Sequence, residues 1–171
     1  MDGVIATAPW SSNFKISWDV EQSGNIFNYK YTISGIDNNL SRDVSYLVLQ
    51  VSDNFTKGDI FNIKNAVLAD GPKFFKEIGG LMGIKFEDIV NPSNLIIEFD
   101  SYRSPMWGSF YTKDGKFKGV DVKAFNSGLE FNTGSFIAVP DTTVVPNTNT
   151  IILMIAGLFF ISVIGLRKCT N

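Results

Sequence analysis

The chain has 171 residues, 44% hydrophobic and 13% aromatic, which is the composition of a folded protein with an excess of aromatic side chains. It has no histidine and a single cysteine, Cys169, which excludes Ser-His-Asp and Cys-His catalysis and histidine-containing metal sites, so we expect neither a metal nor a cofactor. All 17 acidic residues and 13 of the 15 basic residues precede Ile151, and the resulting net charge of −4 argues against binding to nucleic acid.

The N-terminal segment MDGVIATAPWSSNF has neither the basic start nor the apolar core of a signal peptide. Its DGVIATAPW stretch is typical of the residues that follow a cleavage site. We therefore expect a signal peptide to have preceded this sequence in the full-length protein.

Alternating apolar and polar residues predict a series of strands. The residues expected to face the core are Phe14, Ile16, Trp18 and Val20 in the first strand and Phe27, Tyr29, Tyr31 and Ile33 in the second. Further strands are predicted at 44–52, 60–68, 94–100, 108–113, 116–122, 129–132 and 135–139. Asp114-Gly115 is the pair expected to form a two-residue hairpin turn. About eight strands separated by turn residues favour an all-β fold, an antiparallel β-sandwich.

Residues 71–90 have a different pattern from the strands. Pro72 is suited to the first turn of a short helix, with Phe74, Phe75 and Ile78 facing inward. The glycines that follow oppose a longer helix. We therefore predict a short helical insertion, followed by a loop, over one end of the sandwich.

Two carboxylates, Glu98 and Asp100, are two residues apart on a predicted strand and so share a face. Such a pair can serve glycoside hydrolysis when the two carboxyl groups are suitably spaced. Any solvent-facing strand also produces such pairs. A glycan-active enzyme is therefore an alternative hypothesis, and a non-enzymatic protein with no catalytic residues is the leading one.

Three aromatic residues, Tyr102, Trp107 and Tyr111, could form a platform for sugar rings, or could pack in the core or at an edge. The lysines between residues 113 and 123 make the predicted hairpin basic. They could bind acidic polysaccharide or lipid headgroups, although lysines on a sheet edge more often prevent edge-to-edge pairing.

The uncharged run IILMIAGLFFISVIGL, residues 151–166, predicts a transmembrane helix, because it offers no polar face and ends almost at the end of the sequence. Arg167 and Lys168 follow it and favour the cytoplasmic side. The expected organisation is a β-sandwich ectodomain over 1–138, a linker over 139–150, the membrane helix over 151–166 and a basic cytoplasmic tail over 167–171.

A proline-containing linker, a short motif, a brief apolar helix and a terminal basic cluster together resemble the PEP-CTERM sorting signal, which exosortase recognises in Gram-negative bacteria. The usual motif is Val-Pro-Glu-Pro-Ser-Thr. The corresponding residues here are Val145, Pro146, Asn147, Thr148, Asn149 and Thr150. Val145, Pro146 and Thr150 match the usual motif, and the other three positions differ from it.

The resemblance implies an exported protein that resides in the inner membrane with its ectodomain outside. An exosortase-type enzyme would then cleave it near residues 145–150, and the product would reach the outer surface or be secreted. Exopolysaccharide of the surrounding biofilm is the partner expected from this setting. The alternative is a tail-anchored membrane protein that is never processed, with its main domain in the cytoplasm.

Overall fold

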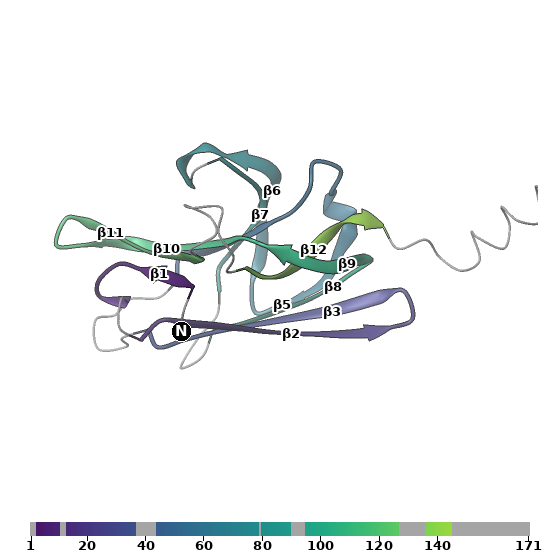
Figure 1. The fold of residues 1–171 in the computed structure, drawn as a ribbon, viewed down its shortest axis with the longest axis horizontal. Coiled ribbons are helices and arrows are strands. Elements are labelled where there is room, and N and C mark those ends of the chain that lie inside the picture. Colours follow the sequence, from purple (N-terminus) through teal and green to yellow (C-terminus); the bar gives the residue numbers. More distant parts are fainter. Residues whose placement is uncertain are drawn as a thin grey trace, which may run out of the picture.

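The computed structural model describes residues 3–10, 13–36, 44–78, 80–89, 95–126 and 136–144. Over these residues the chain forms twelve β-strands and the short 3-10 turns η3 (Lys57–Asp59) and η4 (Lys76–Ile78). All the strand pairs are antiparallel. The sheets pack face to face around one main core (Figure 1), which confirms the predicted all-β class and the antiparallel sandwich.

Three sheets make up the described part of the fold. The six-stranded sheet has the order β1 (Val4–Ala6), β11 (Val120–Asn126), β10 (Phe110–Phe117), β4 (Tyr46–Gln50), β7 (Leu81–Glu87) and β6 (Val67–Phe75). The four-stranded sheet has the order β2 (Lys15–Ser23), β3 (Ile26–Ser34), β8 (Leu95–Ser101) and β5 (Ile60–Lys64). The third sheet pairs β12 (Ile137–Val144) with β9 (Arg103–Gly108).

Strand β9 leads almost directly into β10, so the β9–β12 pair continues the layer of the six-stranded sheet (Figure 1). At the junction, Ser109 N–H donates to Gln50 Oε1 at 2.8 Å and Gln50 N–H donates to Ser109 O at 2.9 Å. Phe110 N–H donates to the side-chain oxygen of Asn126 at 2.8 Å. The side-chain amides of Gln50 and Asn126 thus accept hydrogen bonds from backbone N–H groups at the point where β9 gives way to β10.

The main core lies between the two layers. As predicted, β3 buries four alternate side chains, Phe27, Tyr29, Tyr31 and Ile33. Phe99 on β8 stacks on Tyr29 and Tyr31 at 5.2 and 5.9 Å between ring centroids, and on Phe86 of the other layer at 5.4 Å. Each fully buried side chain of this size contributes about 1.5–3 kcal/mol, so the aromatic cluster joins the two layers firmly.

A second apolar cluster covers the outer face of the six-stranded sheet. Its buried members are Val48, Phe75, Ile78, Leu81, Tyr111 and Phe125. Tyr111 and Phe125 are register partners on β10 and β11, and their rings stack at 6.3 Å. Both faces of this sheet are therefore partly covered, which explains the dense apolar pattern of its central strands.

The predicted turn at Asp114-Gly115 is wrong. The hairpin turns instead at Lys118 and Gly119, which have φ angles of 50° and 84°, the positive values that a two-residue hairpin turn needs. Asp114 and Gly115 lie inside β10, where the register with β11 shifts between Lys113 and Lys116. The Asp-Gly pair thus marks a β-bulge, an irregularity in which Gly is also common.

The short helix and loop predicted over residues 71–90 are also largely wrong, because most of the described part of this segment is strand. Strand β6 runs to Phe75, and only the single 3-10 turn η4 follows before β7 begins at Leu81. Phe75 and Ile78 are buried as predicted, but Phe74 is 54% exposed. Strand geometry places neighbouring side chains on opposite faces, so Phe74 and Phe75 cannot both face inward.

The single strand predicted for residues 60–68 is two strands, β5 and β6. Asn65, at the break between them, adopts a positive φ angle of 61°, which Asn tolerates better than most residues. Asn62, inside β5, has a φ angle of 52° where the register with β8 shifts. Strands β1, β7 and β9 were not predicted. β1 has only three residues, β7 lies in the segment that the sequence assigned to a loop, and β9 contains Pro105.

Residues 139–144, placed at the start of the predicted linker, belong to β12. Val139 is buried, and it pairs in register with Met106 on β9. The predicted strand at 129–132, the sorting motif at 145–150, the membrane helix at 151–166 and the basic tail lie outside the described residues. Among the residues that are described, there is no helix long and apolar enough to cross a membrane.

Candidate groove between strands β2 and β9

An open groove of about 460 Å³ lies between the edge of the four-stranded sheet and the β9–β12 pair. Its lining residues are Trp18, Asp19 and Val20 from β2, Pro105, Met106 and Trp107 from β9, and Ala138 from β12. We call it the Trp18/Trp107 groove.

Two tryptophans dominate this groove. The ring centroids of Trp18 and Trp107 are 6.2 Å apart and their planes meet at 83°, an edge-to-face contact. Trp107 is 67% exposed, Met106 is 41% exposed and Trp18 is 36% exposed. Exposed large apolar side chains that gather at one place on the surface are a feature of interaction sites.

Trp18 was expected in the core, because it alternates with polar residues along its strand. The structure places it on the inner face of the sheet, where it pairs in register with the buried Tyr31 of β3. However, β2 is the last strand of this sheet, so the side chain lies at the border of the core. Alternation identifies the face of a residue, but it cannot distinguish an edge strand from a central one.

The β9–β12 wall of the groove is fixed by two tyrosine hydroxyls of β3. Tyr29 Oη donates to the backbone oxygen of Arg103 at 2.9 Å, and Tyr31 Oη donates to the backbone oxygen of Ala138 at 2.7 Å. Burial, and secondarily the neighbouring Tyr29, raise the pKa of Tyr31. The hydroxyl therefore stays protonated and remains a hydrogen-bond donor.

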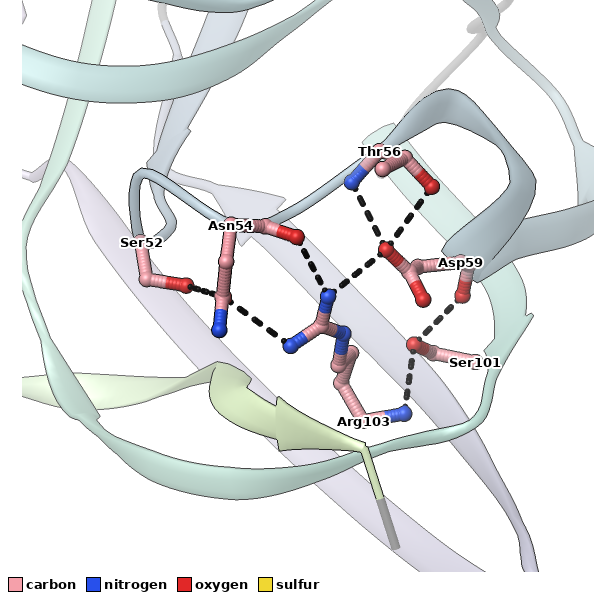
Figure 2. A network of polar contacts seen from close by, with 6 residues as sticks. All are labelled: Ser52, Asn54, Thr56, Asp59, Ser101 and Arg103. Carbon is pink, nitrogen blue, oxygen red and sulfur yellow. Dashed lines mark hydrogen bonds and ion pairs between the residues drawn. The ribbon is translucent and has the colours of Figure 1, made fainter.

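The start of β9 is held by a buried polar network around Arg103 (Figure 2). The guanidinium forms an ion pair with Asp59 at 2.9 Å and donates to the backbone and side-chain oxygens of Asn54 at 2.7 and 3.1 Å. Arg103 N–H donates to Ser101 Oγ at 3.0 Å, and that hydroxyl donates to Asp59 O at 2.7 Å. This network joins η3, β8 and β9.

Asp59 is the single carboxylate in that network. Burial works to raise its pKa, but hydrogen bonds from Arg103 and Thr56, together with the charge of Arg103, outweigh burial and lower the pKa below its ordinary value. Thr56 contributes both its backbone N–H at 2.7 Å and its hydroxyl at 3.0 Å. The carboxylate is therefore ionised at neutral pH and partners the buried guanidinium.

Glu98 and Asp100 share the outer face of β8, as predicted. Glu98 lies 3.1 Å from Lys64 and 3.6 Å from Lys30, while Asp100 accepts hydrogen bonds from the amides of Asn28 and Asn62 at 2.8 and 2.7 Å. The hydrogen bond from Lys64 is the main cause that lowers the pKa of Glu98.

A general acid for glycoside hydrolysis needs the opposite change, a raised pKa. The contacts of Glu98 and Asp100 instead link β8 to its two neighbours, β3 and β5. The pair also lies on the opposite face of the sheet from Trp18. Its geometry therefore suits cross-strand stabilisation better than catalysis.

The three predicted aromatic residues do not form one platform. Trp107 lies in the groove, but Tyr102 packs at a tilt against Phe61 with 4.8 Å between ring centroids, and Tyr111 is buried in the second apolar cluster. The structure thus separates the predicted set and adds Trp18, which the sequence pattern assigned to the core.

The basic hairpin is β10–β11, and its lysines have separate local contacts. Lys113 forms an ion pair with Asp121 at 3.3 Å. Lys118 lies over the ring of Phe117 at 5.3 Å and Lys123 over that of Phe125 at 5.4 Å. These contacts within the hairpin favour a structural role for the three lysines over binding of an acidic ligand.

Comparison with known proteins assigns no family. The chain matches no protein-family model, no curated protein and no solved structure. Function is therefore argued from the Trp18/Trp107 groove itself.

Proposed function

We propose that this protein is a non-enzymatic carbohydrate-binding protein of the cell surface or extracellular matrix, and that the Trp18/Trp107 groove contacts the glycan. The observation that carries this proposal is the exposed tryptophan pair in an open groove. The apolar faces of sugar rings stack on flat aromatic faces, and Trp107 offers most of its surface to solvent.

The size and rigidity of the groove support this role. Its volume of about 460 Å³ lies within the range of small-molecule sites, and it is open to solvent. The tyrosine hydroxyls of β3 and the Arg103 network fix the β9 wall before any ligand arrives. A prearranged site loses less entropy on binding.

The charge of the groove favours a neutral glycan. Asp19 is the ionisable side chain among the described lining residues, and its carboxylate can accept hydrogen bonds from sugar hydroxyls. No cation lies among those lining residues to pair with an acidic polymer. We therefore expect an uncharged exopolysaccharide to bind better than an acidic one.

Delivery to the surface is the second part of the proposal. It is supported by the resemblance of residues 139–168 to a PEP-CTERM sorting signal, with the motif at 145–150. The last described residue of β12, Val144, directly precedes the motif, so cleavage within 145–150 would leave every described strand intact. The protein would reside in the inner membrane with its ectodomain outside, and exosortase would then release it to the surface.

The test is affinity electrophoresis of the protein through gels containing neutral exopolysaccharide from the cells that produce it. We expect Trp107→Ala to weaken retardation about tenfold or more, since truncating a tryptophan that anchors a binding site costs about 2 kcal/mol or more. Phe74→Ala is the matched control, because Phe74 is an exposed aromatic on β6, outside the groove. Equal retardation of both variants and the parent would contradict glycan binding at this site.

A further inference from the structure

The free edge of β2 differs from the other sheet edges in the described part of the chain. β2 has nine residues, contains no proline, and pairs with β3 without a break from Lys15 to Ser23. Figure 1 shows it along the lower border of the molecule. No other described strand pairs with its second edge, which leaves a long regular row of backbone donors and acceptors.

The remaining edges carry features that hinder pairing with another chain. β1 has only three residues, and the registers of β5 and β6 are irregular. The β9–β12 pair contains Pro105 and Pro140, which cannot donate a backbone hydrogen bond. Only β2, among the described edges, is long, regular in register and free of proline, and its charged residues include both signs, Lys15 against Asp19 and Glu21.

The sequence of β2 is complementary to itself when two copies run antiparallel about Trp18. Each Lys15 then lies opposite Glu21 of the second copy, and Ile16 lies opposite Val20 of the second copy. The two Trp18 residues face each other across the two-fold axis. Neither Lys15 nor Glu21 forms an ion pair with another described residue.

We propose that β2 is a homodimer interface, in which two copies of this chain join their four-stranded sheets edge to edge about Trp18. The proposal does not rest on glycan binding. A two-fold contact of this kind uses the same surface on both copies and closes after two subunits.

Other registers of the same two strands are less favourable. Centring the pair on Asp19 places the two Asp19 carboxylates directly opposite each other, which is destabilising. A shift of one residue places Trp18 opposite Asp19 of the second copy and so mixes the apolar and polar faces. The register about Trp18 avoids both conflicts.

The surface above β2 also fits a second copy. Met106 and Trp107 line the groove together with Trp18, and both are exposed. Pairing about Trp18 brings the Trp107 residues of the two copies toward the same axis, where they can cover each other. The partner copy and a glycan would then compete for the Trp18/Trp107 groove.

Charge reversal tests this interface in the full-length chain, kept in mild detergent because of its apolar C-terminal run. Lys15→Glu places a second carboxylate opposite Glu21 at both ends of the interface, and Glu21→Lys places a second ammonium group opposite Lys15. We expect each variant to raise the dimer dissociation constant roughly tenfold in sedimentation velocity. Lys116→Glu is the matched control, since it changes the same charge on the exposed β10–β11 hairpin and should have no effect.

Mixing the two variants gives the decisive result. In a mixed pair, the K15E position of one chain lies opposite the E21K position of the other, so opposite charges meet at both ends of the interface. Differently tagged K15E and E21K chains should therefore capture each other, while each fails to capture itself. A monomeric parent chain at all concentrations tested would overturn the proposal. So would self-association that both reversals leave unchanged, because the interface would then lie elsewhere.

The dimer and the glycan site can be tested separately. Loss of glycan binding in Trp107→Ala, together with mutual capture of the K15E and E21K chains, would support both proposals. Mutual capture without any glycan binding by the parent would support the dimer alone and contradict the proposed function.

Discussion

At the scale of single residues, Arg103 has the greatest effect on the candidate site. Its guanidinium is buried and contacts Asp59 and Asn54, and its backbone contacts Tyr29 and Ser101. A buried charge is tolerated only when it is paired and hydrogen-bonded. Its network therefore fixes where β9 leaves the core and where Trp107 emerges.

We predict that the contribution of Asp59 to stability depends on pH. The folded pKa of Asp59 is lower than its ordinary value of 3.8, so the carboxylate stabilises the fold fully above that value. This contribution is lost as the pH falls through the folded pKa. At pH 6, Asp59→Asn should lower the free energy of unfolding by about 3 kcal/mol, since it leaves the buried Arg103 without its counter-charge.

Urea denaturation of parent and variant from about pH 6 to about pH 2.5 measures this difference, which should shrink steadily in the acid range. Glu98→Gln is the control, because Glu98 lies on the outer face and its ion pairs are exposed. It should cost no more than about 1 kcal/mol. A difference between parent and Asp59→Asn that stays constant over the whole range would show that the charge of Asp59 has no role in stability.

At the scale of elements, the β10–β11 hairpin shows how a turn can be misplaced from sequence. Lys118 adopts a left-handed conformation at φ 50°, although Lys is not favoured there. The backbone of this hairpin thus overrides a local preference. The better turn pair, Asp114-Gly115, is instead used at the bulge in β10, where Ser45 Oγ donates to Asp114 at 3.1 Å.

Lys118→Asn should therefore raise the free energy of unfolding by about 0.5–1 kcal/mol, because Asn-Gly is the preferred pair for a two-residue hairpin turn. Asp114→Asn is the matched change at the position where the sequence placed the turn, and it should bring no gain. Thermal denaturation followed by circular dichroism compares the two. Stabilisation by Asp114→Asn alone would place the turn at Asp114-Gly115 after all.

The elements that the sequence predicted well are those in which one physical pattern acts alone. β3 and β8 alternate cleanly because one face of each is buried, and their inward residues, such as Tyr29 and Phe99, follow from period two. β9 could not be predicted, because Pro105 and exposed apolar residues obscure the alternation. The groove depends on β9 meeting the edge of β2, which is a matter of topology, so only Trp107 of its two tryptophans was identified.

At the scale of the whole molecule, β12 connects the sandwich to the residues that resemble a sorting signal. Val139 is buried in the core, and the strand extends to Val144. Cleavage before β12 would remove a strand that contributes to the core, whereas cleavage after β12 would remove none of the described strands. The fold therefore sets a lower limit on where processing can occur without loss of stability.

We predict that the mature protein recovered from cells that produce it ends between residues 145 and 150, after β12 and before the apolar run. Intact-mass measurement of the protein recovered from those cells gives this end directly. Pro146→Ala should reduce processing, since Pro146 is one of the motif positions that match. Pro140→Ala, in β12, is the control and should be processed normally. If the parent protein still carries residues 151–171, the apolar run is a permanent anchor and exosortase sorting loses its support. The proposals for the groove and for the β2 edge do not depend on that outcome and can be tested on the anchored protein.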